Sequence, residues 1–186
     1  MLALVGIADW IKNMLEKVAF ASGWLLVVLM FITTFDIVCR KLGIPIPLTK
    51  FQEMEYYLHT TVFSFWMGYN YSINTHPRVD SYTEQFSLRI RAWIELIGCL
   101  VFALPFMLMI VYYGWDFFYS SMLQNEASEN SSGLPWRWVM KGIFYLGMWF
   151  VVLGIISMML RLIAFLFGGL SQAETKLDLG HVELEA

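Results

Sequence analysis

Apolar runs alternate with short polar connections along the chain, and this pattern predicts a bundle of helices that cross a membrane. Two stretches, residues 56–75 and 96–115, each hold twenty residues without Asp, Glu, Lys or Arg. A helix of about 20 residues, rising about 1.5 Å per residue, spans the ~30 Å hydrocarbon core of a bilayer. The chain is therefore expected to be an all-α integral membrane protein with one transmembrane domain at 18–168. Its four transmembrane helices are expected at about 18–40, 52–75, 92–116 and 138–167.

The two ends of the chain differ from this pattern. Within residues 1–17, Trp10, Ile11 and Leu15 recur on one helical face, and charged side chains lie elsewhere. This arrangement predicts an N-terminal amphipathic helix at the membrane surface, although a plain extension of the first transmembrane helix fits equally well. Residues 169–186 contain four acidic residues against one lysine, which predicts an acidic flexible tail.

The second predicted helix carries a polar stripe, which distinguishes it from a helix that faces lipid on all sides. Plotted at about 100° per residue, seven positions fall on one stripe: Gln52, Glu55, His59, Phe63, Trp66, Asn70 and Asn74. Polar side chains are unfavourable in hydrocarbon unless they are paired, so the stripe is expected to face protein. The spacing leaves two interpretations open: the interior of this chain's own bundle, or another subunit.

Asp36 is the only charged residue inside the first apolar run. It precedes Arg40 by four residues, which is one helical turn. An isolated carboxylate in a membrane helix would indicate an ion path, but one with an arginine a turn away is more often structural. We therefore predict an intrahelical pair between Asp36 and Arg40.

Composition supports the membrane assignment and narrows the classes of function. Hydrophobic residues make up 59% of the chain and charged residues 15%, whereas soluble domains carry about 25% charged residues. The net charge of −3 equals that of the tail after Gly169, so the remainder of the chain is neutral. A neutral body offers no basic surface for binding nucleic acid.

The sequence shows no residue pattern typical of a catalytic or metal centre, so we expect no enzyme activity and no cofactor. His59 and His76 are seventeen residues apart. This separation is about 25 Å along a helix, so the two cannot ligate one haem within a subunit. Two alternatives to a non-catalytic companion subunit remain: the membrane anchor of a redox enzyme, and a small homo-oligomeric transporter.

Several short segments are characteristic when taken together. In chain order they are Arg40-Lys41, Gln52-Glu53-Met54-Glu55, Gly68, His76-Pro77-Arg78-Val79-Asp80, Asn125-Glu126-Ala127-Ser128 and Gly133-Leu134-Pro135-Trp136. With them the chain resembles, over about residues 10–167, the small membrane subunit of tripartite ATP-independent periplasmic (TRAP) transporters. The sequence departs from the family pattern at Pro77 and in the Gln-Glu-Met-Glu segment.

The resemblance implies a sodium-coupled importer of organic acids that is built from three components. A periplasmic binding protein captures the substrate, a large membrane subunit transports it, and the small subunit braces the scaffold of the large one. The resemblance, together with the polar stripe, places the partner interface at Glu53, Glu55, His59, Trp66, Asn70, Glu126 and Glu129. It also implies a structural loop at His76, Arg78 and Asp80.

Four transmembrane helices place both termini on the same side of the membrane. We assign seven of the Lys and Arg residues to the terminal side and five to the other side. Because cytoplasmic segments carry an excess of positive charge, this count favours cytoplasmic termini. We expect a multi-pass protein of the bacterial inner membrane.

Overall fold

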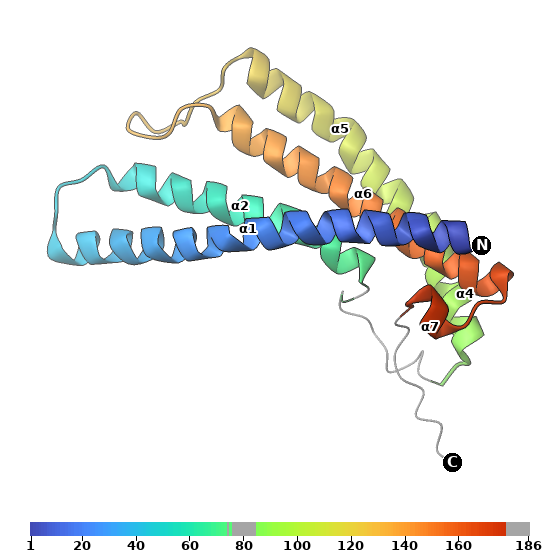
Figure 1. Ribbon diagram of the computed structural model, residues 1–186. Helices are drawn as coiled ribbons and strands as arrows, with labels where there is room; N and C mark the ends of the chain where they lie inside the picture. Colours follow the sequence, from blue (N-terminus) through green and yellow to red (C-terminus); the bar gives the residue numbers. More distant parts are fainter. Residues whose placement is uncertain (74, 76–84, 178–186) are drawn as a thin grey trace.

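The computed structural model describes residues 1–73, 75 and 85–177, and every regular element within them is helical. The elements are α1 (Leu2–Leu42), α2 (Leu48–Ser72), α4 (Leu88–Gly98), η1 (Cys99–Ala103), α5 (Leu104–Leu123), α6 (Arg137–Gly168) and α7 (Gln172–Thr175). The α1–α2 and α5–α6 connections lie at one end of the molecule, and the start of α1 lies near α4 and α7 at the other (Figure 1). The predicted loop residues His76, Arg78 and Asp80 lie outside the described residues.

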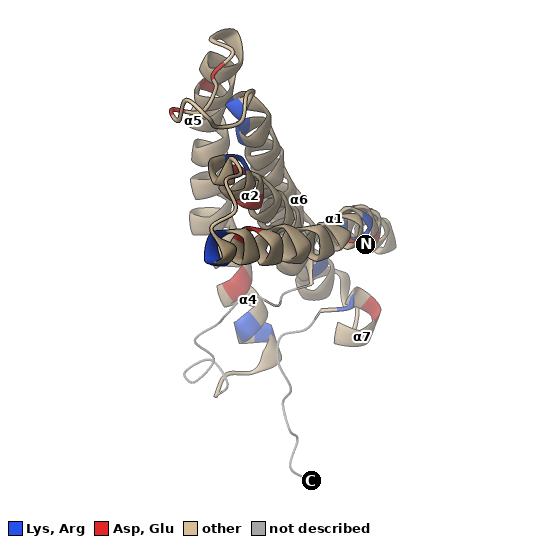
Figure 2. Cartoon of the chain, turned by 90° about the vertical axis from the view of Figure 1, so that its left-hand side faces the viewer, with Lys and Arg blue, Asp and Glu red and all other residues tan. Residues whose placement is uncertain are grey.

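The expected all-α membrane fold is confirmed. In the described part of the chain, three helical stretches are long and apolar enough to cross a membrane: Leu2–Leu42, Leu88–Leu123 and Arg137–Gly168. α2 has 25 residues, a length of about 37 Å, and is therefore also long enough to cross a membrane. Its mean hydropathy is lower because of the polar stripe. Charged side chains are sparse on the ribbon, and most of it is uncharged (Figure 2).

The N-terminal amphipathic segment is not a separate helix, because α1 continues without a break through Leu42. This is the second of the two interpretations that the sequence left open. Val5, Ala8, Ile11 and Leu15 are buried on one side of it, at steps of three and four residues. Ser157 of α6 donates a 3.0 Å hydrogen bond to the carbonyl oxygen of Ala8. Ile11 and Leu15 of the predicted apolar face therefore pack against protein, whereas Trp10 is 67% exposed.

The third helical stretch is interrupted by one π-helical turn. η1 lies directly before Pro105, which occupies the first turn of α5. Proline has no backbone N–H to donate, and a wider turn removes the need for that hydrogen bond. The helix also continues to Leu123, beyond the expected end at residue 116.

α6 is the central helix of the fold and packs against α1, α2 and α5. Small residues allow α2 and α6 to approach closely: Gly147 faces Ser64, and an added Cβ at Gly68 would lie 2.5 Å from the backbone oxygen of Phe150. Ser64 is completely buried. Such small-residue contacts are typical of helix pairs in membranes.

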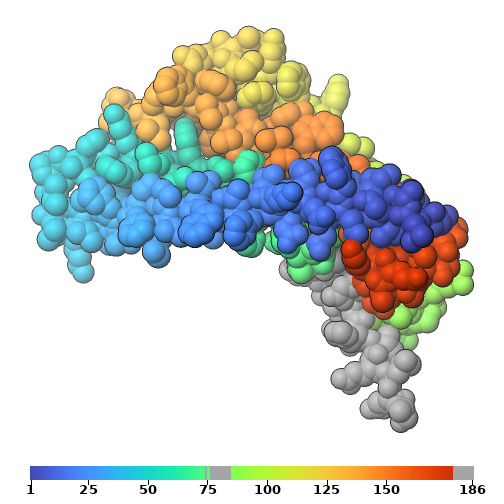
Figure 3. All heavy atoms as spheres, in the orientation of Figure 1, coloured from blue at the N-terminus to red at the C-terminus, as the bar shows by residue number. Residues whose placement is uncertain are grey.

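Residues 169–177 are packed against the helical domain, which corrects the expectation of a flexible tail throughout 169–186. Thr175 is fully buried and Leu177 belongs to the apolar cluster that contains Leu162. Arg161 donates hydrogen bonds to the carbonyl oxygen of Thr175 (2.9 Å) and to Asp9 (2.7 Å). In the space-filling view, α7 lies directly against the first turns of α1 (Figure 3). Arg161 holds this segment against the helices. The acidic composition of the tail gives no sign of that contact.

Candidate functional site

Glu53 fastens the start of α2 to the α5–α6 connection. Its carboxylate accepts hydrogen bonds from the Ser128 hydroxyl, from Asn130 Nδ2 (3.2 Å) and from the Leu134 backbone N–H (2.6 Å). Gly133 leaves the room for this contact, because an added Cβ there would lie 2.6 Å from Glu53 Oε1. The side chain that we expected to face a partner therefore orders a loop of its own chain.

Two further acids of the connection are paired with bases at the start of α6. Lys141 Nζ lies 2.5 Å from Glu126 Oε2, and Arg137 Nη1 lies 3.1 Å from Glu129 Oε1 and 3.7 Å from Glu126 Oε1. The hydrogen bond from Lys141 holds the pKa of the Glu126 carboxyl below its ordinary value. We call Glu53, Glu126, Glu129, Arg137 and Lys141 the loop cluster.

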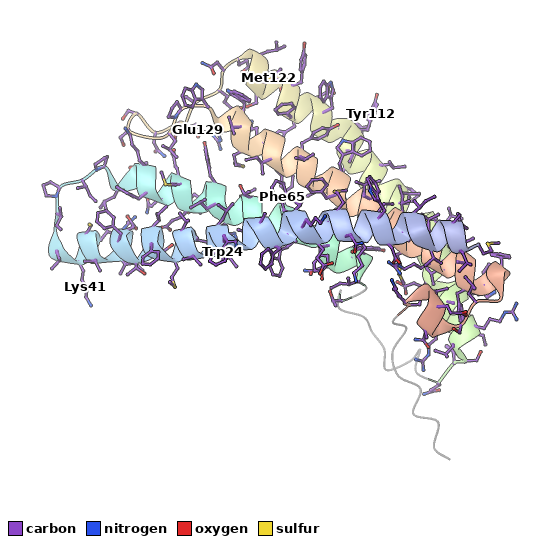
Figure 4. The ribbon with its side chains drawn as sticks, in the orientation of Figure 1. Trp24, Lys41, Phe65, Tyr112, Met122 and Glu129 are labelled. Carbon is purple, nitrogen blue, oxygen red and sulfur yellow. The ribbon has the colours of Figure 1, made fainter. Side chains whose placement is uncertain are left out.

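A pocket of about 350 Å³ opens beside the loop cluster. It is lined by side chains from α2, from the α5–α6 connection and from α6, including Glu53, Tyr57, Glu129 and Arg137. The side chain of Glu129 is 90% exposed, and Figure 4 shows it in the connection near the start of α2. The pocket thus presents tyrosine, carboxylate and guanidinium groups to whatever contacts this end of the molecule.

The central residues of the α2 polar stripe lie on the outer surface of the chain. His59, Phe63 and Trp66 are exposed, and Gln52, Glu55 and Asn70 are half-buried. Asn74 lies outside the described residues. The residues of α2 that pack inside the bundle are instead Val62, Ser64, Gly68 and Ser72. The stripe therefore does not fill the interior of this chain's own bundle.

Asp36 and Arg40 contact each other and also reach α2. Arg40 Nε lies 2.7 Å from Asp36 Oδ2. When the side-chain amide of Gln52 is oriented with its oxygen toward Arg40, that oxygen accepts hydrogen bonds from both Nη1 and Nη2 of Arg40. The distance from Arg40 Nη1 to the Gln52 oxygen is 3.1 Å. Glu55 is a second carboxylate near Arg40. The pair predicted within one helix thus also connects α1 with α2.

The described residues offer no group of three or more His, Cys, Asp or Glu side chains that could hold a metal ion. Cys39 and Cys99 are buried and are not joined in a disulfide. The arrangement at the α2 stripe and the loop cluster is suited to contact with another protein.

The sequence did not identify the basic residues of the loop cluster, Arg137 and Lys141. We had used both only to count charges on the two sides of the membrane. Their spacing was a usable signal, because residues four apart on a helix lie on one face and two acids precede them within a short connection.

The comparisons give one match to a family. Residues 29–169 match the model of the family described as "Tripartite ATP-independent periplasmic transporters, DctQ component". No curated protein and no solved structure matches the chain.

Proposed function

Because this chain belongs to the family of DctQ components of tripartite ATP-independent periplasmic transporters, we propose that it braces the large subunit of a sodium-coupled organic-acid importer. The chain is the small membrane subunit of a TRAP transporter, and such a subunit is not an enzyme. Family membership therefore overturns the alternative of a redox-enzyme anchor, and it favours a companion subunit over a small homo-oligomeric transporter.

The exposed stripe on α2 is the observation that carries the bracing role. His59, Phe63 and Trp66 would lie against lipid if the chain stood alone, and a histidine there would lack a polar partner. A second membrane subunit supplies both apolar contact and hydrogen bonds. We place the large transport subunit on this stripe, including Glu55 and Asn70.

The loop cluster supports a second contact, with the periplasmic substrate-binding protein. It lies at the end of the molecule opposite the N-terminus, where Glu129 and the pocket are accessible (Figure 4). With the termini in the cytoplasm of an inner-membrane protein, this end faces the periplasm. Glu53 acts there by holding the connection in place for its partner.

Reconstitution in proteoliposomes tests the proposal. The purified chain alone should transport no substrate, because the described part of the chain offers no cluster for an ion at mid-membrane. Uptake that depends on a sodium gradient should require the large subunit and the binding protein as well. Uptake by this chain alone, or by the complete set without sodium dependence, would contradict the proposal.

A further inference from the structure

A second hollow is lined by residues of α5 and α6, none of which belongs to the α2 stripe or the loop cluster. Its volume is about 530 Å³, and its lining includes Tyr112, Trp115, Asp116, Tyr145 and Trp149. Four aromatic rings and one carboxylate thus share one concave surface. Figure 4 shows Tyr112 on the outer side of α5.

The rings of this hollow are held in place by packing. Gly114 provides room for Tyr145, because an added Cβ would lie 3.3 Å from its ring. The ring centroids of Trp115 and Tyr145 are 5.9 Å apart, and Tyr119 stacks on Trp115 at 5.4 Å. The rings of Trp115 and Tyr145 are therefore preorganised, so a ligand need not order them on binding.

Asp116 brings a negative charge that no described residue neutralises. Its backbone oxygen accepts a hydrogen bond from Ser120 (2.6 Å), but its carboxylate makes no hydrogen bond or ion pair with another described side chain. Aromatic faces attract cations through their quadrupole, and such aromatic surfaces recognise ammonium groups in known sites. The hollow is therefore complementary to an ammonium ion.

The level of the hollow relative to the membrane indicates which ammonium compound it binds. Asp116 directly follows the uncharged run 96–115, and Tyr145 is one helical turn from Lys141, which pairs with Glu126 in the connection. This is the level where hydrocarbon gives way to lipid headgroups. The neighbouring surface of α5 also exposes Leu108 and Met109, as expected of a face in contact with lipid.

We propose that this hollow binds the ammonium headgroup of a phospholipid, with Asp116 as the counter-ion and Trp115, Tyr145 and Trp149 around the cation. Its acyl chains lie along the apolar surface of α5. The proposal goes beyond the transport function and does not depend on it, because it requires only that the chain spans a membrane.

Competition between two lipids tests this site. The full-length chain, extracted with any subunits bound to it, is exchanged into an equimolar mixture of phosphatidylethanolamine and phosphatidylglycerol with identical acyl chains. Bound lipid is then measured by mass spectrometry. The wild type should retain phosphatidylethanolamine preferentially, and Asp116→Asn should lower that preference by roughly tenfold.

Three further variants make the result specific. Asp116→Glu should keep the preference, because it keeps the charge. Trp149→Leu should lose the preference for phosphatidylethanolamine. This variant also tests the site if Asp116→Asn does not fold. Trp24→Leu is the matched control, since Trp24 is a 66% exposed aromatic residue on α1, and it should change nothing.

Equal retention of the two lipids by the wild type would overturn the proposal, as would an unchanged preference in both Asp116→Asn and Trp149→Leu. If a basic side chain of a partner subunit occupied the hollow instead, Asp116→Asn would reduce co-purification of that subunit and leave lipid retention unchanged. That result would also overturn it.

Discussion

At the scale of single residues, the charged side chains of this protein act mainly as connectors between helices. Arg40 joins α1 to Gln52 of α2, and Glu53 joins α2 to the α5–α6 connection. Arg161, only 2% exposed, joins α6 to Asp9 of α1 and to Thr175. A charge in or near a membrane is favourable only when it is paired, and here the pairs also fix how the helices lie.

The Asp36–Arg40 pair should be measurable with a double-mutant cycle. Asp36→Asn leaves Arg40 without its carboxylate partner and should lower the free energy of unfolding by about 1 kcal/mol, since Arg40 is partly exposed. Arg40→Gln and the double variant complete the cycle, measured by thermal unfolding in detergent. A coupling free energy indistinguishable from zero would remove the pair from the stability of α1.

The loop cluster should respond to acid through Glu126. Its pKa is lowered in the folded protein by the hydrogen bond from Lys141, so its ionised form stabilises the fold. That stabilisation is complete above the ordinary pKa of 4.5 and is lost as the pH falls through the lowered value. Hydrogen-exchange protection factors of residues 125–137 should therefore decrease below about pH 4.5. Glu126→Gln should reduce this pH dependence but not abolish it, because the pKa of Glu53 is also lowered: despite partial burial, its carboxylate accepts a hydrogen bond from the Leu134 backbone N–H. A pH dependence as large as that of the wild type in Glu126→Gln would contradict the role of Glu126.

At the scale of helices, α2 has two faces with different tasks. Small residues face α6, where Gly68 packs on the backbone of Phe150, and His59, Phe63 and Trp66 face outward. The ring of Trp66 also lies over Gly23 of α1, 3.5 Å from where a Cβ would stand. α2 thus packs against α6 with one face and presents the proposed partner surface on the other.

The inner face of α2 can be tested with a pair of glycine substitutions. Gly68→Ala places a methyl group against backbone atoms of Phe150 and should destabilise the protein by about 1–3 kcal/mol. Gly98→Ala is the matched control, because nothing lies within 4 Å of the added carbon and alanine favours a helix. In unfolding measurements in detergent, Gly68→Ala should be less stable than Gly98→Ala. Equal stability of the two variants would contradict the close approach of α2 and α6.

The outer face of α2 should be required for assembly but not for folding. Trp66→Ala should weaken binding of the large subunit by ~2 kcal/mol, because buried aromatic side chains dominate interface free energies. Adding His59→Leu should weaken it further. Co-purification of the large subunit measures the effect, while size-exclusion chromatography of this chain should show an unchanged monodisperse peak. Aggregation of the variant with normal binding by its soluble fraction would place the partner surface elsewhere.

At the scale of the whole molecule, the start of α1 and residues 172–177 meet beside α6. Asp9 near the start of α1 contacts Arg161 and Lys176, each at 2.7 Å, and α7 covers that end of the bundle (Figure 3). The α1–α2 and α5–α6 connections lie at the opposite end, which we call the loop end (Figure 1). With the cytoplasmic termini that we propose, the loop end is the one that faces a periplasmic binding protein.

Cysteine labelling in intact cells tests the orientation of these ends. Ser131→Cys, in the α5–α6 connection, should react with a membrane-impermeant maleimide from the periplasm. Ser81→Cys, in the connection between α2 and α4, should react only after the inner membrane is opened. The wild type is the control, because Cys39 and Cys99 are each only 2% exposed. Periplasmic labelling at position 81 would reverse the orientation.

The sequence alone determined the membrane class, the helical fold and the approximate helix positions, because apolar runs long enough to span a bilayer have few other uses. It also placed Asp36 one turn from Arg40, since a helix repeat is a local property. It did not show that α6 is the central helix. In a membrane a buried face and a lipid-facing face are both apolar, so α6 carries no amphipathic period to reveal its neighbours.

Only the tertiary structure decided which polar groups meet across the fold. Glu53 and Ser128 are 75 positions apart, and Asp9 and Arg161 are 152 apart. Helical spacing predicts partners three or four residues away, but contacts of this separation depend on how the helices pack. For the same reason, residues 169–177 read as a flexible acidic tail, whereas Arg161 and the apolar cluster around Leu162 hold them in place.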